Sequence, residues 1–166
     1  MGEEMVETVE GRLFVPYRNW YGTKASRFFL ELRDRKRLLA TRCSRCDKVL
    51  MPPRSVCPDC FQELGDWVEL PPRGTLITYT TVHYDYSDYY QPKKAPYSLG
   101  IVRLDGAHTG MCHFLGEVDP EEIHVGMRVE AVFRETREGN ILDIAYFKPI
   151  EHGINQEASH KDGHGG

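Results

Sequence analysis

Two closely spaced cysteine pairs constrain this chain more than any other feature. Cys43 and Cys46 form one C-x2-C pair, and Cys57 and Cys60 form a second after an interval of ten residues. The two-residue gap lets both thiolates of a pair point at one ion, and four thiolates favour zinc in a closed tetrahedron. The spacing therefore predicts a structural zinc site with no position left for water or substrate. A redox dithiol, or iron in a rubredoxin-like site, would suit the same spacing.

The chain divides by composition into four segments, and the predicted fold class is mainly β. The predicted domains are an N-terminal arm with an amphipathic helix, a zinc ribbon, a five-stranded OB-fold barrel and a disordered tail, over 1–36, 37–72, 73–150 and 151–166. The helix is expected from Thr23, as N-cap, to about Arg35, because apolar residues recur there at helical spacing. Segment 37–72 is rich in turn residues and poor in apolar ones, so we expect a metal to organise it.

Segment 73–150 contains five runs of β-branched, aromatic or alternating residues, separated by turn signals. These predicted strands are 74–83, 97–104, 109–114, 128–134 and 141–147. Asp105-Gly106 is a strong hairpin signal between the second and third. Five short strands fit a closed barrel, which removes exposed edges, better than an open sheet. An OB-fold is the leading prediction, and another small barrel of similar strand number is the alternative.

Charge is unevenly distributed in this 166-residue chain of net charge −4. Residues 24–54 hold ten Lys/Arg and three Asp/Glu, whereas the remainder is acidic. Such a positive segment can bind phosphate groups, although a solvated helix face would look the same. No apolar run is long enough to cross a membrane, and the acidic N-terminus does not resemble a secretory signal or transit peptide. We therefore expect a cytoplasmic protein with no membrane partner.

The fifth cysteine, Cys112, is followed directly by His113, and such a pair suggests a nucleophile and its base. Adjacent residues on a strand point to opposite faces of the sheet, however, so the two side chains are not expected to meet. We expect Cys112 to be a small buried thiol. No other catalytic motif is recognisable, so the sequence predicts no catalytic residue of its own.

A tyrosine-rich loop between the first two predicted strands is the second candidate site. Its candidate contact residues are Tyr84, Tyr86, Tyr89, Tyr90, Lys93 and Lys94. Tyrosine rings could receive an adenine or an aromatic acyl group, and the lysines could receive phosphate. The same composition would also stack single-stranded bases. A tyrosine cluster packed on the barrel wall is the structural alternative.

The order of these features resembles a known family. An amphipathic helix precedes the two cysteine pairs, and a barrel opens at Gly74-Thr-Leu, with Pro96-Tyr97 before its second strand and Val125-Gly126-Met127 before its fourth. This order resembles the acyl-CoA-associated zinc-ribbon/OB-fold proteins that accompany thiolases and related condensing enzymes. The resemblance covers roughly residues 20–150.

The resemblance implies a non-catalytic subunit of a thiolase-type acyltransferase complex. Such a subunit docks on a thiolase-like catalytic partner, which supplies the catalytic cysteine and histidines, and helps to bind coenzyme A or an acyl-CoA thioester. The sequence is also similar to small subunits of thiolases that act on an aromatic thioester, such as benzoylsuccinyl-CoA. The alternative is a single-stranded nucleic-acid-binding protein, because zinc ribbons and OB barrels serve there too. The net negative charge argues against that alternative.

Overall fold

The computed structural model describes residues 18–86 and 91–150. The predictions for residues 1–17, for Tyr89 and Tyr90 and for the tail 151–166 lie outside these described residues. The elements in chain order are α1 (Gly22–Arg35), β1 (Leu38–Arg42), β2 (Val49–Leu50), β3 (Asp66–Leu70), β4 (Arg73–Val82), β5 (Tyr97–Leu104), β6 (Met111–Leu115), β7 (Arg128–Phe133), the 3-10 helix η1 (Ile141–Asp143) and β8 (Ile144–Pro149).

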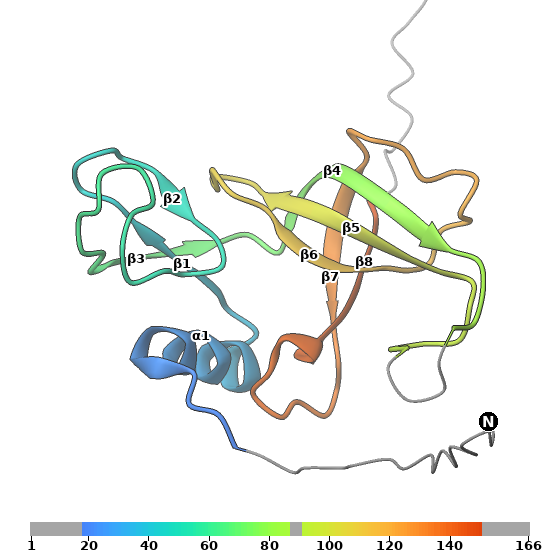
Figure 1. Cartoon of the computed structure of the whole chain (residues 1–166), viewed down its shortest axis with the longest axis horizontal. Coiled ribbons are helices and arrows are strands. Elements are labelled where there is room, and N and C mark those ends of the chain that lie inside the picture. The colour runs from blue at the N-terminus through green and yellow to red at the C-terminus, as the bar shows by residue number, and fades with distance from the viewer. Residues whose placement is uncertain (1–17, 87–90, 151–166) are drawn as a thin grey trace, which may run out of the picture.

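The strands form a small sheet and a closed barrel that lie side by side (Figure 1). The sheet has the order β2-β1-β3, and the barrel closes in the order β4-β5-β6-β8-β7. All neighbouring barrel strands are antiparallel except β6 and β8, which are parallel. A mainly β fold with an N-terminal helix and a five-stranded barrel of the OB type is thereby confirmed.

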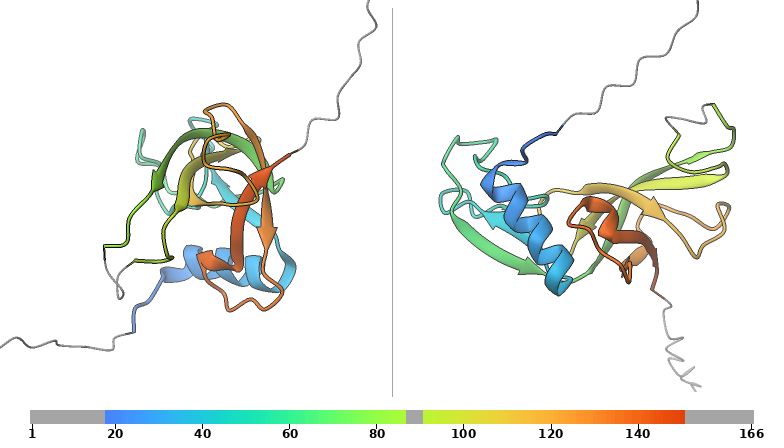
Figure 2. Two further views of the ribbon diagram at one scale, coloured as in Figure 1. Left: turned by 90° about the vertical axis from the view of Figure 1, so that its right-hand side faces the viewer. Right: turned by 90° about the horizontal axis from the view of Figure 1, so that it is seen from below.

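Helix α1 lies across the junction between sheet and barrel, beside η1 (Figure 2). Its predicted apolar face is correct, because Phe28 and Leu32 are almost fully buried. The predicted N-cap is wrong. The helix begins at Gly22 after Tyr21, which makes no side-chain capping hydrogen bond, so Thr23 already lies inside the first turn. At the other end the left-handed Lys36 donates its backbone N–H to the Leu32 carbonyl at 3.1 Å.

The cysteine-bearing segment contains more regular structure than its sequence indicates. Strand β1 pairs with β3 along its whole length, from Leu38 opposite Leu70 to Arg42 opposite Asp66. Leu38, Leu39 and Ala40 are all buried, since β1 packs against α1. These residues share one hydrophobic core with the barrel. Part of the order of this segment therefore comes from the helix and the barrel, and not from a metal alone.

A second connection joins the sheet to the turn between β5 and β6. The Val49 backbone N–H donates to Nδ1 of His108 at 3.0 Å, and the His108 N–H donates to the Val49 carbonyl at 2.8 Å. Thr109 Oγ1 accepts from the Met51 N–H at 2.7 Å and donates to the Met51 carbonyl at 2.8 Å. Strand β2 and the residue after it, Met51, are thus fixed to the barrel by four hydrogen bonds.

The first four barrel strands begin and end within two residues of their predicted bounds, and the last begins three residues later than predicted. Residues 141–143 form η1 because Asn140 Oδ1 accepts from the Leu142 N–H at 2.8 Å, and β8 starts only at Ile144. Gly74, the second residue of β4, allows the backbones of β4 and β5 to lie close together. A Cβ there would lie 2.3 Å from the Arg103 carbonyl oxygen on β5. A side chain at this position would push the two strands apart.

Cys112 and His113 occupy opposite sides of β6. His113 is buried inside the barrel, and Cys112 is exposed on its outer wall. The prediction of a buried Cys112 thiol was wrong. Alternation puts the two residues on opposite faces of β6, and barrel closure puts His113, opposite Gly100, inside and Cys112, opposite Ile101, outside. His113 accepts from the Phe114 N–H and lies 3.1 Å from the Ile141 carbonyl, so its two ring nitrogens are used within the barrel. Burial lowers the pKa of His113.

Among the described residues, no helix has the length and apolar character needed to span a bilayer.

Candidate metal centre and neighbouring surfaces

The four cysteines of the two pairs converge on one point between the β1–β2 hairpin and a second hairpin, closed by the Val56–Glu63 bridge. Their Sγ atoms all lie within 4.8 Å of one another, and Cys43 Sγ is 3.6 Å from Cys60 Sγ. Sulfurs held 2.3 Å from a tetrahedral zinc would be about 3.8 Å apart, so the arrangement fits that ion. Cys43 and Cys57 are fully buried, and Leu50 and Leu64 pack beside them. The four-cysteine cluster is therefore a closed metal-binding group.

The two cysteine pairs lie in knuckles with the same backbone geometry. In the first knuckle the Asp47 N–H donates to the Cys43 carbonyl at 2.8 Å, and in the second the Phe61 N–H donates to the Cys57 carbonyl at 3.0 Å. Each first cysteine also donates its N–H across its hairpin, at 2.9 Å in both cases. Asp47 and Phe61 occupy equivalent positions, and both have φ of 59°.

The sulfurs differ in how readily they ionise in the absence of a cation. The backbone N–H groups of Cys60 and Asp59 favour the Cys57 thiolate and lower its pKa to about 7. Hydrogen bonding with the Cys60 sulfur, together with burial, raises the pKa of Cys46 to about 12. Cys46 is therefore a thiol at neutral pH in the absence of a cation. A bound divalent cation would stabilise thiolates at this site, as a structural zinc does.

Five of the ten Lys/Arg of segment 24–54 form ion pairs within the fold. Its ion pairs are Arg33–Asp34, Arg35–Glu31, Arg37–Glu31, Arg37–Glu69, Arg42–Asp47 and Lys48–Asp59. The Arg27 guanidinium lies 4.5 Å from the centre of the Trp67 ring and the Lys24 ammonium 5.7 Å, and Lys24 also donates to the Leu64 carbonyl. Glu69 and Asp59, which lie outside the segment, offset part of its positive charge, so it offers somewhat less charge for phosphates than its sequence indicated.

The tyrosine-rich loop is held by a set of polar contacts. Asp85 Oδ1 accepts from Gln91 Nε2 at 2.8 Å and from the Ala95 N–H at 2.9 Å, while Gln91 Oε1 accepts from the Tyr86 N–H at 2.8 Å. Tyr84 and Tyr86 are exposed, and their ring centres lie 6.4 Å apart. These two rings therefore offer an accessible aromatic surface.

The two predicted lysines of this loop lie at a surface pocket of about 260 Å³. Tyr97, Leu115 and Ile123 also line the pocket, and Tyr84 and Tyr86 do not. The Lys93 ammonium lies 4.1 Å from the centre of the Phe114 ring, and burial, followed by the nearby Arg134, lowers its pKa. The pocket combines one apolar wall with two amines.

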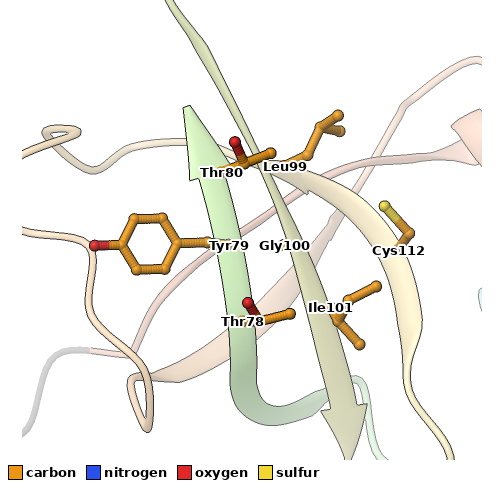
Figure 3. A pocket seen from close by; sticks show the side chains of 7 residues that line it. All are labelled: Thr78, Tyr79, Thr80, Leu99, Gly100, Ile101 and Cys112. Atoms are coloured by element: carbon orange, nitrogen blue, oxygen red, sulfur yellow. The ribbon is translucent and has the colours of Figure 1, made fainter. Parts of the chain in front are cut away.

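A second pocket, of about 230 Å³, lies on the outer barrel wall (Figure 3). It is lined by the backbone and side chains of β4, β5 and β6, including Thr78, Leu99, Ile101 and Cys112. The sequence did not predict this groove, because its residues come from three strands and share no motif. Phe61, whose side chain is exposed, was also not predicted as a functional residue. The sequence does mark it, because an aromatic residue follows the second cysteine pair where an aspartate follows the first.

Comparison with known proteins identifies both parts of the chain. Residues 30–64 match the family model of the ChsH2 rubredoxin-like zinc ribbon domain, and residues 67–134 match that of the ChsH2 C-terminal OB-fold domain. The first of these matches supports zinc at the four cysteines.

Relatives with similar sequences are found in archaea. A DUF35 domain-containing scaffold protein of Methanocaldococcus jannaschii is 35% identical over 132 residues, which are 75% of this chain and 90% of that protein. A protein of the same description from Pyrococcus furiosus is 34% identical over 133 residues, 76% of this chain and 93% of that one.

Two solved structures share the fold. The Ltp2-ChsH2(DUF35) aldolase matches with a TM-score of 0.56 and 24% identity, over 79% of this chain and 98% of the matched chain. A DUF35 protein of unknown function from Sulfolobus solfataricus matches with a TM-score of 0.54 and 21% identity, over 67% of this chain and 78% of that one. From the sequence relatives and the two domain matches together, the chain belongs to the DUF35 family of zinc-ribbon/OB-fold proteins.

Proposed function

We propose that this chain is a non-catalytic scaffold subunit that docks on a catalytic subunit of the thiolase or aldolase type. The observation that carries the proposal is the alignment, through both domains, with archaeal relatives described as DUF35 scaffold proteins. The Ltp2-ChsH2(DUF35) aldolase, which shares the fold, supports a partner of this enzyme class.

The described site is suited to support rather than to chemistry. Four sulfurs complete the coordination of a tetrahedral metal, so the metal has no open position at which to activate water or a carbonyl. The ribbon and the barrel share one hydrophobic core, which lets them present a partner with a single rigid surface.

The substrate of the complex is, in this proposal, a coenzyme A thioester, and the tyrosine-rich loop contributes to holding it. Lys93 and Lys94 would meet phosphate or carboxylate groups at their pocket. Tyr84 and Tyr86, together with Tyr89 and Tyr90, would meet the adenine or an aromatic acyl group such as benzoylsuccinyl. Tyr97 lines the same pocket as the lysines, and burial and then the Tyr86 hydroxyl raise the pKa of its phenol.

The functional test compares thioester cleavage or condensation by the catalytic subunit with and without this chain. We expect turnover to depend on the chain at stoichiometric ratio. Equal turnover by the catalytic subunit alone, together with unchanged coenzyme A affinity, would contradict the proposal.

The lysine pocket is tested by replacing Lys93 and Lys94 with Ala in the intact complex. Loss of hydrogen bonds to charged groups should weaken coenzyme A binding about tenfold or more, measured by isothermal titration calorimetry. The matched control replaces Arg45 and Arg54 with Ala, which removes the same charge from segment 24–54. If the control weakens binding and the lysine variant does not, the phosphates lie on the ribbon instead.

A further inference from the structure

Phe61 combines two unfavourable features at one residue. Its side chain is 80% exposed, and its backbone is left-handed with φ of 59°. Exposed apolar residues are common on protein surfaces, but a bulky aromatic residue in the left-handed region is a genuine outlier. Such outliers concentrate at functional sites, where the surroundings enforce them.

The equivalent residue of the first knuckle shows that zinc binding does not require an aromatic residue. Asp47 has the same φ and the same hydrogen bond to its cysteine carbonyl. Aspartate tolerates the left-handed region, and Asp47 also forms an ion pair with Arg42. The knuckle geometry thus explains the conformation at both positions, but it does not explain the choice of phenylalanine at the second.

The surroundings of Phe61 combine apolar and acidic groups. Val56, in the same hairpin, is 45% exposed and pairs with Glu63. Residues 55–66 contain Asp59, Glu63 and Asp66 and no Lys or Arg, and because Lys48 pairs with Asp59 at 2.7 Å, Glu63 and Asp66 carry the remaining negative charge. A negative rim disfavours nucleic acid, coenzyme A phosphates and anionic lipid as occupants. It favours a protein surface whose apolar socket is edged by cations.

We propose that Phe61, with Val56 beside it, is the docking residue that inserts into an apolar, cation-rimmed socket of the catalytic subunit. This inference rests on the proposed scaffold function and names the residue through which the chain contacts the catalytic subunit. An aromatic residue centred in a desolvated pocket is the usual form of a binding hot spot. The exposed Phe61 ring lies outside the knuckle's own core, which consists of Leu50, Leu64 and the cysteines.

The test measures binding of the full-length, zinc-loaded chain to the catalytic subunit that accompanies it in its source, by biolayer interferometry. Phe61→Asn keeps the left-handed backbone and should weaken binding about 30-fold or more. Phe61→Leu should retain much of the affinity because it keeps an apolar side chain. Asp47→Asn makes a matched change at the equivalent position of the first knuckle and should bind as the wild type does. Zinc content and thermal unfolding of every variant are measured alongside.

Rim charges are tested separately with Glu63→Gln and Asp66→Asn together. This double variant should slow association and reduce its salt dependence while changing dissociation little. An unchanged association rate would contradict the proposal that cations edge the socket of the catalytic subunit.

The outcomes separate this inference from the proposed function. If the wild type binds and Phe61→Asn binds equally well, the docking residue is wrong and the scaffold function stands. If the wild type does not bind the catalytic subunit at all, both fail. If the wild type self-associates and Phe61→Asn does not, the socket belongs to a second copy of this chain, and the assignment to the catalytic subunit is overturned.

Discussion

The two zinc knuckles have nearly identical frames but different surroundings. Each contributes one fully buried and one half-buried cysteine, and each closes with the same backbone hydrogen bonds. The first knuckle leads into β2, which is bonded to the β5–β6 turn of the barrel through His108 and Thr109. The second carries the exposed Phe61 on an acidic hairpin. The two knuckles of one metal site thus differ in role. The first attaches the ribbon to its own barrel, and the second is available to a partner.

The largest expected effect tests whether zinc binding depends equally on the two knuckles. Cys43→Ser and Cys57→Ser should each abolish zinc binding, because a closed site needs all four sulfurs. Zinc content per chain, measured by plasma mass spectrometry, checks this. Retention of zinc in either variant would break the equivalence of the two knuckles.

Hydrogen exchange after chelation sharpens the same comparison. The amides of Val49 and Met51 bond to barrel residues, so they should keep more protection than those of Phe61 and Leu64, whose acceptors lie in the second hairpin. Equal loss of protection in the two knuckles would show that the metal, and not the barrel, orders both.

The next effect concerns the leucine beneath each knuckle. Leu50 and Leu64 are each 1% exposed and pack in the same small cluster as the cysteines. Truncation to Ala should lower the free energy of unfolding by about 2–5 kcal/mol at either position. Urea unfolding of the zinc-loaded variants checks this. A much smaller loss for Leu64→Ala would mean that the second knuckle is already loose.

A smaller effect of opposite sign is expected at Phe61. Phe61→Asn relieves a disfavoured backbone conformation and should raise the free energy of unfolding by about 1 kcal/mol. Asp47→Asn should give no comparable gain, because aspartate already tolerates that conformation and has its ion pair with Arg42. Thermal unfolding of the two variants checks this. A variant that gains stability and loses partner binding would identify Phe61 as a residue kept for function.

The smallest effect is expected for the ion pair that links the two knuckles, Lys48 to Asp59 at 2.7 Å. Both side chains are about half exposed, so solvent and salt screen their attraction. Lys48→Met should leave thermal unfolding nearly unchanged at moderate salt. A marked loss would mean that this contact, rather than the shared metal, holds the knuckles together.

Features with a strong local signal could be predicted from the sequence. The cysteine spacing indicated the metal cluster, and residue alternation with Asp105-Gly106 indicated the barrel strands, because both signals depend on neighbouring residues. Apolar periodicity placed Phe28 and Leu32 in the core. Thr23 failed as an N-cap, since the observed N-cap, Tyr21, lies two residues earlier.

Features that arise from long-range packing could not be predicted. Leu38, Leu39 and Ala40 form a strand because α1 and β3 cover them, and nothing in their local sequence alternates. Two ion pairs of the basic segment, Arg37–Glu69 and Lys48–Asp59, use carboxylates that only the fold brings close. Alternation placed Cys112 and His113 on opposite faces of β6, but only the closed barrel decides that His113 is inside and Cys112 outside.

The most direct test of the scaffold function is native mass spectrometry of the protein purified from its source, at moderate and at raised salt. We expect a stoichiometric complex with a thiolase- or aldolase-type subunit that survives the higher salt, because an apolar contact is little screened. A lone chain, or a chain carrying nucleic acid that raised salt removes, would contradict it.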